Sequence, residues 1–158
     1  MANTANIQRV FEIQGDEIHD DIPLDAAVKI FEGQAVSYLT AAGTAHTLVQ
    51  GATENFGGFA MRLANNTTST VVTAAPTDGL ALSASVRVRT RGHVQLTVAA
   101  GGVLAGTNAD KGLAVYASDG ETFTGSNAAN NVQIGKVERW VSGTTYIVTF
   151  EAAPARSV

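Results

Sequence analysis

The sequence Val86-Arg87-Val88-Arg89-Thr90-Arg91-Gly92-His93-Val94-Gln95-Leu96-Thr97-Val98 alternates almost without interruption between two kinds of side chain. Successive side chains of a strand point to opposite faces, so this spacing predicts one long extended element. Its buried face carries Val86, Val88, Val94 and Leu96, and its other face carries a row of Arg87, Arg89 and Arg91. Gly92 permits a bulge or a sharp bend within the element.

The arginine row needs opposite charge nearby, because like charges on one face of a strand repel each other. Half of all the acidic residues lie between Met1 and Glu32. We predict that the row contacts carboxylates of a protein partner or of this acidic segment, with Asp16, Glu17, Asp20 and Asp21 as the candidates. The alternative is a solvated edge strand, on which cations deter pairing with another sheet.

The pattern of short apolar segments and turn residues in the remaining chain is typical of an all-β protein. Short apolar segments follow one another from residue 34 to 150, separated by Gly, Asn or Pro. This spacing predicts a compact β-barrel or β-sandwich with short strands and little or no helix. Ser142-Gly143 predicts a hairpin turn near the end of the chain. We assign residues 1–27 to an acidic arm and residues 28–158 to the β domain, and residues 24–31 fit either a helical turn or a strand.

A faint internal repeat spans the two halves of the sequence. Glu32-Gly33-Gln34-Ala35-Val36 is echoed by Lys111-Gly112-Leu113-Ala114-Val115, and the strand opening at Gly58 is echoed by the strand opening at Gly135. The spacing from Gly33 to Gly112 is nearly equal to the spacing from Gly58 to Gly135. The repeat predicts two related sheet halves joined by the arginine-bearing stretch, and chance recurrence of Gly-then-strand is the alternative.

Composition limits the possible partners. The net charge of −4 argues against a nucleic-acid binder, which needs a basic field. No apolar run approaches the ~20 residues of a membrane span, and we expect no secretion signal. The absence of Cys fits a protein made in a reducing cytoplasm. Only 15% of the residues are charged, which indicates large protein–protein contacts.

The sequence shows no catalytic, cofactor or metal motif. His19, His46 and His93 have no spacing that places two ligands on one face, although His19 among Asp16, Asp20 and Asp21 offers a loose cation site. No serine lies in a Gly-x-Ser-x-Gly elbow. We therefore expect neither an enzyme nor a bound cofactor. Trp140 with Tyr116 and Tyr146 offers an alternative function, a platform for stacking on sugars.

The succession of Gly-strand segments resembles the small phage head decoration proteins, also called capsid cement proteins. The matching segments are Glu32 to Val36, Phe56 to Ala60, Val86 to Val94, Gly112 to Tyr116 and Ile134 to Glu138. The resemblance implies a β-barrel or sandwich, commonly a homotrimer, without catalytic residues. It further implies a structural virion protein that is made in the host cytoplasm and binds the major capsid protein on the outside of the head. A carbohydrate- or receptor-binding β module is the alternative.

Overall fold

A computed structural model describes residues 6–12, 18–39, 42–51, 53–66 and 84–152. Strands dominate these residues, and the only helical elements among them are two short 3-10 turns, Asn108–Asp110 and Ala128–Asn130. The strands are β1 Phe11–Glu12, β2 Ile18–Pro23, β3 Lys29–Ile30, β4 Ala35–Leu39, β5 Thr44–Thr47, β6 Phe56–Ala60, β7 Ala64–Asn65, β8 Ser85–Ala99, β9 Ala114–Ala117, β10 Phe123–Thr124, β11 Val132–Ser142 and β12 Thr145–Glu151. The predicted all-β class is confirmed.

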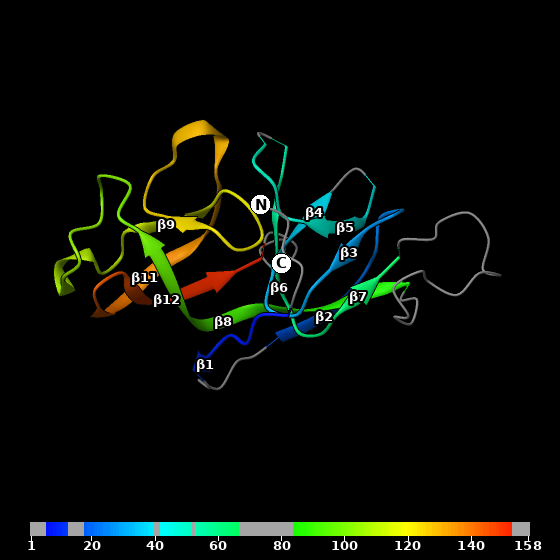
Figure 1. Ribbon diagram of the computed structural model, residues 1–158, viewed down its shortest axis with the longest axis horizontal. Helices are drawn as coiled ribbons and strands as arrows, with labels where there is room; N and C mark the ends of the chain where they lie inside the picture. Colours follow the sequence, from blue (N-terminus) through cyan, green and yellow to red (C-terminus); the bar gives the residue numbers. More distant parts are fainter. Residues whose placement is uncertain (1–5, 13–17, 40–41, 52, 67–83, 153–158) are drawn as a thin grey trace.

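β8 is a continuous strand of 15 residues that curves along most of the length of the molecule, with β1 and β2 below it in Figure 1. Its predicted inward residues, Val86, Val88, Val94 and Leu96, are all buried. Pairing with β12 continues through Gly92 without a register shift, so the strand bends there rather than breaking. The strand is thus longer than the short strands expected, because its two ends belong to different halves of the fold.

The second half of the chain closes into a five-stranded barrel. Its strands follow one another in the order β8, β12, β11, β9 and β10, and β10 then pairs with β8 again. The closing contact is parallel and joins Phe123 to Val98. Of the two architectures predicted, a barrel is therefore the observed one, and closure removes the free edges that an open sheet would expose.

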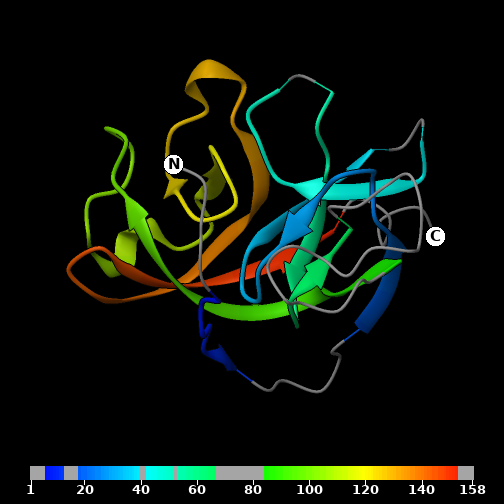
Figure 2. The same cartoon turned by 45° about the vertical axis from the view of Figure 1, so that its right-hand side comes forward.

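The first half repeats this arrangement on the other end of β8. Its strands follow the order β2, β8, β6, β4 and β5. A parallel bridge between Leu24 and Ala45 returns β5 to the end of β2. Figure 2 shows the blue and cyan strands of the first half and the yellow, orange and red strands of the second half, with green β8 continuing from one half into the other.

Matching backbone hydrogen bonds show that the two halves are related. Gly33 donates to Ala60 O at 2.8 Å, and Gly112 donates to Val137 O at 2.8 Å. In return, Ala60 donates to Gln34 O at 2.9 Å and Val137 donates to Leu113 O at 2.8 Å. The paired residues are separated by the same spacings as the glycines of the sequence repeat. The predicted repeat is confirmed as two sheet halves that share β8.

The glycines near the start of β6 and β11 occupy equivalent places. A Cβ at Gly58 would lie 2.5 Å from Arg89 O, and a Cβ at Gly135 would overlap Thr149 O. In each half the neighbouring strand approaches so closely that only glycine fits. Arg89 of β8 therefore corresponds to Thr149 of β12.

Each half has its own apolar core, and β8 contributes to both. Val86 and Val88 belong to the cluster of the first half, whereas Val94, Leu96 and Val98 belong to that of the second. Phe56 and Phe59 of β6 reach into the second cluster, where the rings of Phe59 and Phe150 lie 5.0 Å apart, edge to face. Each such fully buried side chain stabilises the fold by about 1.5–3 kcal/mol.

The segment before residue 28 is partly integrated into this sheet. β2 pairs with β8, and Ile22 and Leu24 are buried in the first core. The prediction that residues 1–27 form an arm outside the β domain is therefore wrong for residues 18–24, which belong to the sheet and its core. The helical alternative for residues 24–31 is also wrong, because residues 26 and 27 form a turn and Lys29–Ile30 form β3.

Candidate binding surface

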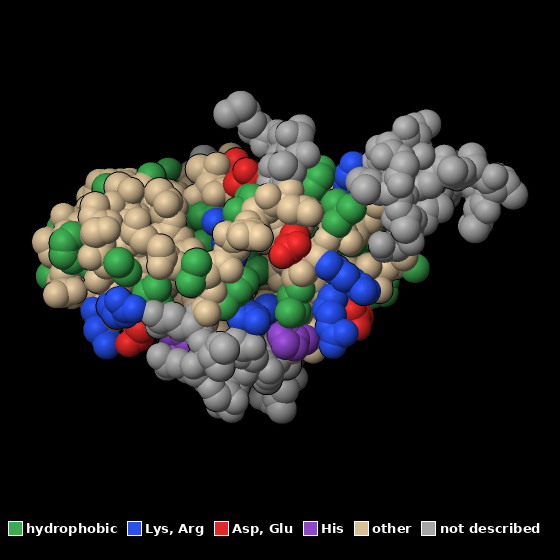
Figure 3. Space-filling model, turned by 60° about the horizontal axis from the view of Figure 1, so that its bottom comes forward, with side chains coloured by type: hydrophobic (Ala, Val, Ile, Leu, Met, Phe, Trp, Pro, Cys, Tyr) green, Lys and Arg blue, Asp and Glu red, His purple; other side chains and the backbone are tan. Residues whose placement is uncertain are grey.

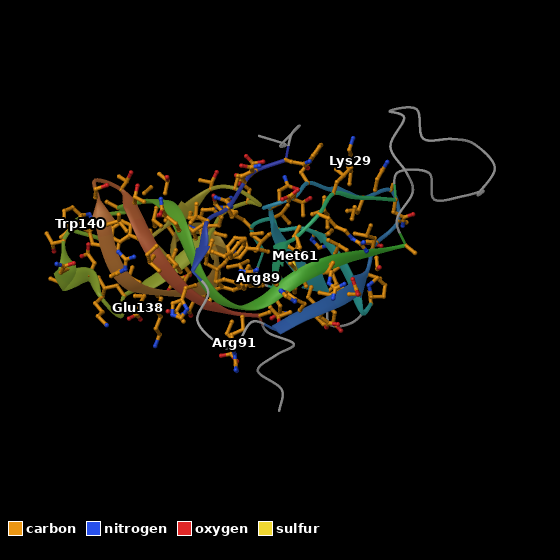
Figure 4. The ribbon with its side chains drawn as sticks, turned by 90° about the horizontal axis from the view of Figure 1, so that it is seen from below. Lys29, Met61, Arg89, Arg91, Glu138 and Trp140 are labelled. Atoms are coloured by element: carbon orange, nitrogen blue, oxygen red, sulfur yellow. The ribbon has the colours of Figure 1, made fainter. Side chains whose placement is uncertain are left out.

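The three arginines of β8 lie on its outer face, as the alternation predicts. Arg87 is exposed, whereas Arg89 and Arg91 are half-buried. In Figure 3 cationic, acidic and histidine side chains lie in a band across the lower part of one face, and the upper part is mainly uncharged. Figure 4 shows Arg89 and Arg91 near the middle of the molecule, between Met61 and Glu138 in that view.

Arg91 finds its carboxylate within the chain. Its Nη2 donates to Glu151 Oε1 at 2.7 Å, and the two residues are cross-strand partners of β8 and β12. Their side chains are 42% and 38% exposed, so water screens the pair and it stabilises the fold by about 0.2–1 kcal/mol. We predicted that the arginine row contacts a carboxylate of the acidic N-terminal segment or of another protein. Arg91 instead contacts a carboxylate of β12 in the same chain.

Arg89 is held by an aromatic ring. Its Cζ lies 4.1 Å from the centroid of the Phe11 ring, a close cation–π contact. Phe11 in turn packs edge to face on Phe59 and Phe150, with centroids 6.2 Å away in both cases. The middle of the arginine row is thus anchored by the N-terminal segment.

Of the candidate acids, Asp21 lies closest to the row in register. It is the cross-strand partner of Arg87, and both side chains are exposed. Asp20 pairs in register with Val88, one position off the arginine face, and its Oδ1 accepts from the Asp21 amide at 2.8 Å. Asp16 and Glu17 lie outside the described residues. The structure therefore brings one acid beside one arginine, at the exposed end of the row.

Arg9 is a residue of this surface that the sequence did not single out. Its Nε donates to Gly33 O at 2.8 Å, and its Cζ lies 4.9 Å from the Phe123 ring centroid. Burial lowers the pKa of Arg9 to about 10, although nearby Glu121 favours the charge. The only signal in the sequence was the alternation of Ile7, Arg9 and Phe11, which does not reveal burial.

A second charged group lies on the outer face of the second half. Lys111 Nζ donates to Glu138 Oε1 at 3.0 Å. This bond holds the pKa of Glu138 below its usual value; burial opposes the shift, and the proximity of His93 adds to it. The group borders a cavity of about 480 Å³ whose lining includes Lys111, Glu138, Thr149 and Glu151.

Ser37, Glu54 and His46 bring a serine, an acid and a histidine together in the first half. Ser37 Oγ and His46 Nε2 both bind Glu54 Oε2, and the histidine contact measures 3.0 Å. In a nucleophilic triad the histidine lies between the serine and the acid. Here the acid lies between them and Ser37 is fully buried, so the cluster braces β4 against β5 and offers no activated nucleophile.

The predicted aromatic platform is wrong in one of its members. Tyr146 is only 2% exposed, and its hydroxyl donates to Asp110 Oδ2 at 3.1 Å. Trp140 is half-buried against the second core, and its Nε1 donates to Gly143 O at 3.0 Å. A sugar cannot stack on Tyr146 in this fold, because the ring lies in the core.

Asp110 accepts several hydrogen bonds in the second half. Its donors are the amides of Ala105, Gly106 and Thr107 at 2.9, 2.8 and 3.1 Å, as well as the hydroxyl of Tyr146. The Ala105 amide, and then the other donors, lower the pKa of Asp110 against the opposing effect of burial. Burial, together with the contact to Asp110, raises the pKa of Tyr146.

The described residues contain no group of three or more His, Cys, Asp or Glu side chains placed to hold a metal ion. No helix among them is long and apolar enough to cross a membrane. Comparison with protein-family models and with curated proteins finds no match to the chain. The structure shows an all-β protein whose two related halves share one long strand, β8.

Proposed function

We propose that this chain is a structural virion protein, a capsid cement or decoration protein that binds the outside of a phage head. The observation that supports this proposal most is the outer face of β8. Arg91 and Arg89 are held there by Glu151 and Phe11 of the same chain, while Arg87 stays exposed beside the edge strand β2. The low charged fraction, 15%, and the resemblance described above also support a protein made for contacts with other proteins.

The proposed mechanism needs no chemistry and no cofactor. Copies of the protein, made in the host cytoplasm and associated as homotrimers, bridge neighbouring major capsid subunits and add interface area to the shell. A protein that binds only the assembled lattice stabilises it by mass action. Arg87 contributes a charge-assisted hydrogen bond to a carboxylate of the capsid protein.

The decisive experiment measures binding to purified heads. Incubation with expanded, undecorated heads of the phage that encodes the chain should produce co-sedimentation and should raise the melting temperature of the shell. Arg87→Ser should weaken binding by about three- to tenfold, and the effect should fall as salt rises because exposed charges are screened. Arg139→Ser, which removes an exposed arginine from β11, is the matched control. Absence of binding to these heads contradicts the proposal.

Arg87→Ser is a sharper variant than replacement of all three arginines. Arg91 and Arg89 make contacts within the chain, so their loss also disturbs β12 and the N-terminal segment. Arg87 is the exposed member of the row, and its replacement should leave the fold intact. Light scattering tests the trimer separately: the proposal expects three times the 16.3 kDa of one chain.

A further inference from the structure

The N-terminal segment, residues 6–11, lies in a groove on the outer face of the first half. Ile7 donates its amide to Glu32 O at 2.7 Å, and Arg9 Nε donates to Gly33 O at 2.8 Å. Together with residues 7–11, the groove is bordered by Glu32, Gly33, Ala60, Met61 and Arg89. The segment thus binds as an extended peptide, through backbone carbonyls that follow one another in the loop before β4.

The second half has an equivalent groove. The repeat relates Glu32, Gly33, Ala60, Met61 and Arg89 to Lys111, Gly112, Val137, Glu138 and Thr149, and all five of the latter line the cavity of about 480 Å³. A Cβ at Gly33 would overlap Ile7 O, whereas a Cβ at Gly112 would meet nothing within 4 Å. The space that Ile7 fills in the first half is therefore open in the second.

The hydrogen-bond acceptors of this second groove are available. In the first half the carbonyls of Glu32 and Gly33 accept from the N-terminal segment. The equivalent carbonyls of Lys111 and Gly112 accept no hydrogen bond from the residues that the structure describes. In the first groove one of these acceptors binds a backbone amide and the other binds a side chain, so an unpaired carbonyl at Lys111 is suited to the amide of an extended peptide.

The side chains of the second groove select a different charge. Phe59, which is fully buried between Phe11 of the N-terminal segment and the second core, corresponds to Lys136, which is exposed. The carboxylates that line the cavity already have cations of the same chain: Glu138 binds Lys111, and Glu151 binds Arg91. Lys136 makes no ion pair with the residues that the structure describes, so a carboxylate in the place of Arg9 would pair with it. Each chain also has one N-terminal segment, and that segment already fills the first groove. Both facts argue against a second copy of this chain as the occupant.

We propose that the groove of the second half binds an extended segment of a partner protein. One residue of this segment donates its backbone amide to Lys111 O, as Ile7 does to Glu32 O in the first half. The residue two positions further along the segment, in the place of Arg9, is acidic. The carbonyl of Lys111 supplies the backbone contact that Glu32 O makes with the Ile7 amide in the first half. The carbonyl of Gly112, whose equivalent accepts from the Arg9 side chain, stays open to water. Lys136 supplies the preference for an acid. This groove lies apart from Arg87, so head binding through Arg87 and peptide binding here fail or succeed independently.

The test uses a peptide derived from the N-terminal segment as the probe. A blocked hexapeptide with the sequence of residues 6–11 but with Glu in place of Arg9 is titrated into the full chain, and amide chemical shifts are followed. We expect shifts at residues 111–113 and 136–138, with a Kd of about 0.1–1 mM, as is usual for a short peptide with few contacts. The unchanged hexapeptide should bind about threefold more weakly or worse, the size of effect expected for one exposed ion pair.

Charge reversal in the chain separates groove binding from non-specific attraction. Lys136→Glu should invert the preference between the two peptides, whereas Arg62→Glu, the matched control on an exposed cation of the first half, should leave it unchanged. The proposal is overturned if the acidic peptide shows no saturable binding, if shifts at residues 32–33 report exchange with the chain's own segment, or if the preference survives Lys136→Glu. Concentration-dependent shifts at residues 7–11 without peptide would identify a second copy as the occupant and would equally overturn it.

Discussion

The two halves of this protein share a strand order but treat the same outer face in opposite ways. In the first half, Phe11 of the N-terminal segment packs on Phe59 of β6, and Phe59 is fully buried between this segment and the second core. In the second half no described segment covers β11 in this way, and Lys136 stands at the position of Phe59. The comparison shows how a repeated backbone diverges: one aromatic side chain makes a surface part of the core, and one lysine leaves it to solvent or to a partner.

The feature that both halves keep is the close approach of neighbouring strands at Gly58 and Gly135. Replacing Gly135 by Ala should cost about 2–4 kcal/mol of unfolding free energy, because its Cβ would overlap Thr149 O and backbone must move. Gly58→Ala should cost a similar amount. Urea denaturation measures both, with Gly143→Ala as control, where nothing lies within 4 Å and only the left-handed backbone costs about 1 kcal/mol. A near-neutral Gly135→Ala would mean that the halves are not equivalent at this position.

The feature that the halves do not share is the aromatic cover of the first groove. Phe11→Ala should cost about 2 kcal/mol, because the half-buried ring packs on Phe59 and Phe150 and supports Arg89. Thermal melting and urea denaturation provide the measurement. Val10→Ala is the matched control, since Val10 is 60% exposed. Equal stability of the two variants would show that the segment does not stabilise the first half.

The second half has its own brace, in Asp110 and Tyr146. The pKa of Asp110 is lowered in the folded state, below about 3.9 for an unfolded chain, so the ionised carboxylate contributes stability above that value. This contribution is lost as the pH falls through the folded pKa. Asp110→Asn should therefore destabilise the protein at pH 7, by less than Phe11→Ala because Asn keeps one acceptor oxygen, and the difference from wild type should shrink below about pH 4.

Melting curves between pH 2.5 and 7 test this assignment. Tyr146→Phe provides the comparison, because it removes one hydroxyl donor and leaves the three amide donors to Asp110 in place. Its stability should still decline in acid, as that of the wild type does. A stability difference between Asp110→Asn and wild type that stayed constant with pH would show that the charge of Asp110 contributes nothing.

Period-two patterns in the sequence were sufficient to predict the faces of β8 and the all-β class. The repeat was also visible, because glycines that permit close approach recur at a fixed spacing. The role of β2 was hidden by its acids, although Ile18, Ile22 and Leu24 share one parity. Burial of Arg9 could not be predicted, because it depends on a groove formed by residues distant in sequence. The Arg91–Glu151 pair depends on strand register, which alternation alone does not specify.

Two exposed ion pairs of the described residues, Arg91–Glu151 and Lys111–Glu138, should have the smallest effects. Glu151→Gln removes the ion pair with Arg91, whose side chains are 42% and 38% exposed, so we expect a loss of about 0.5 kcal/mol that fades in 1 M salt. Glu138→Gln, which removes the pair with the more exposed Lys111, should cost still less. Urea denaturation at two salt concentrations resolves both. A salt-independent loss above about 2 kcal/mol at Glu151 would instead mean that the arginine row is an internal brace between the halves, and Arg87 would then remain its only member suited to a partner.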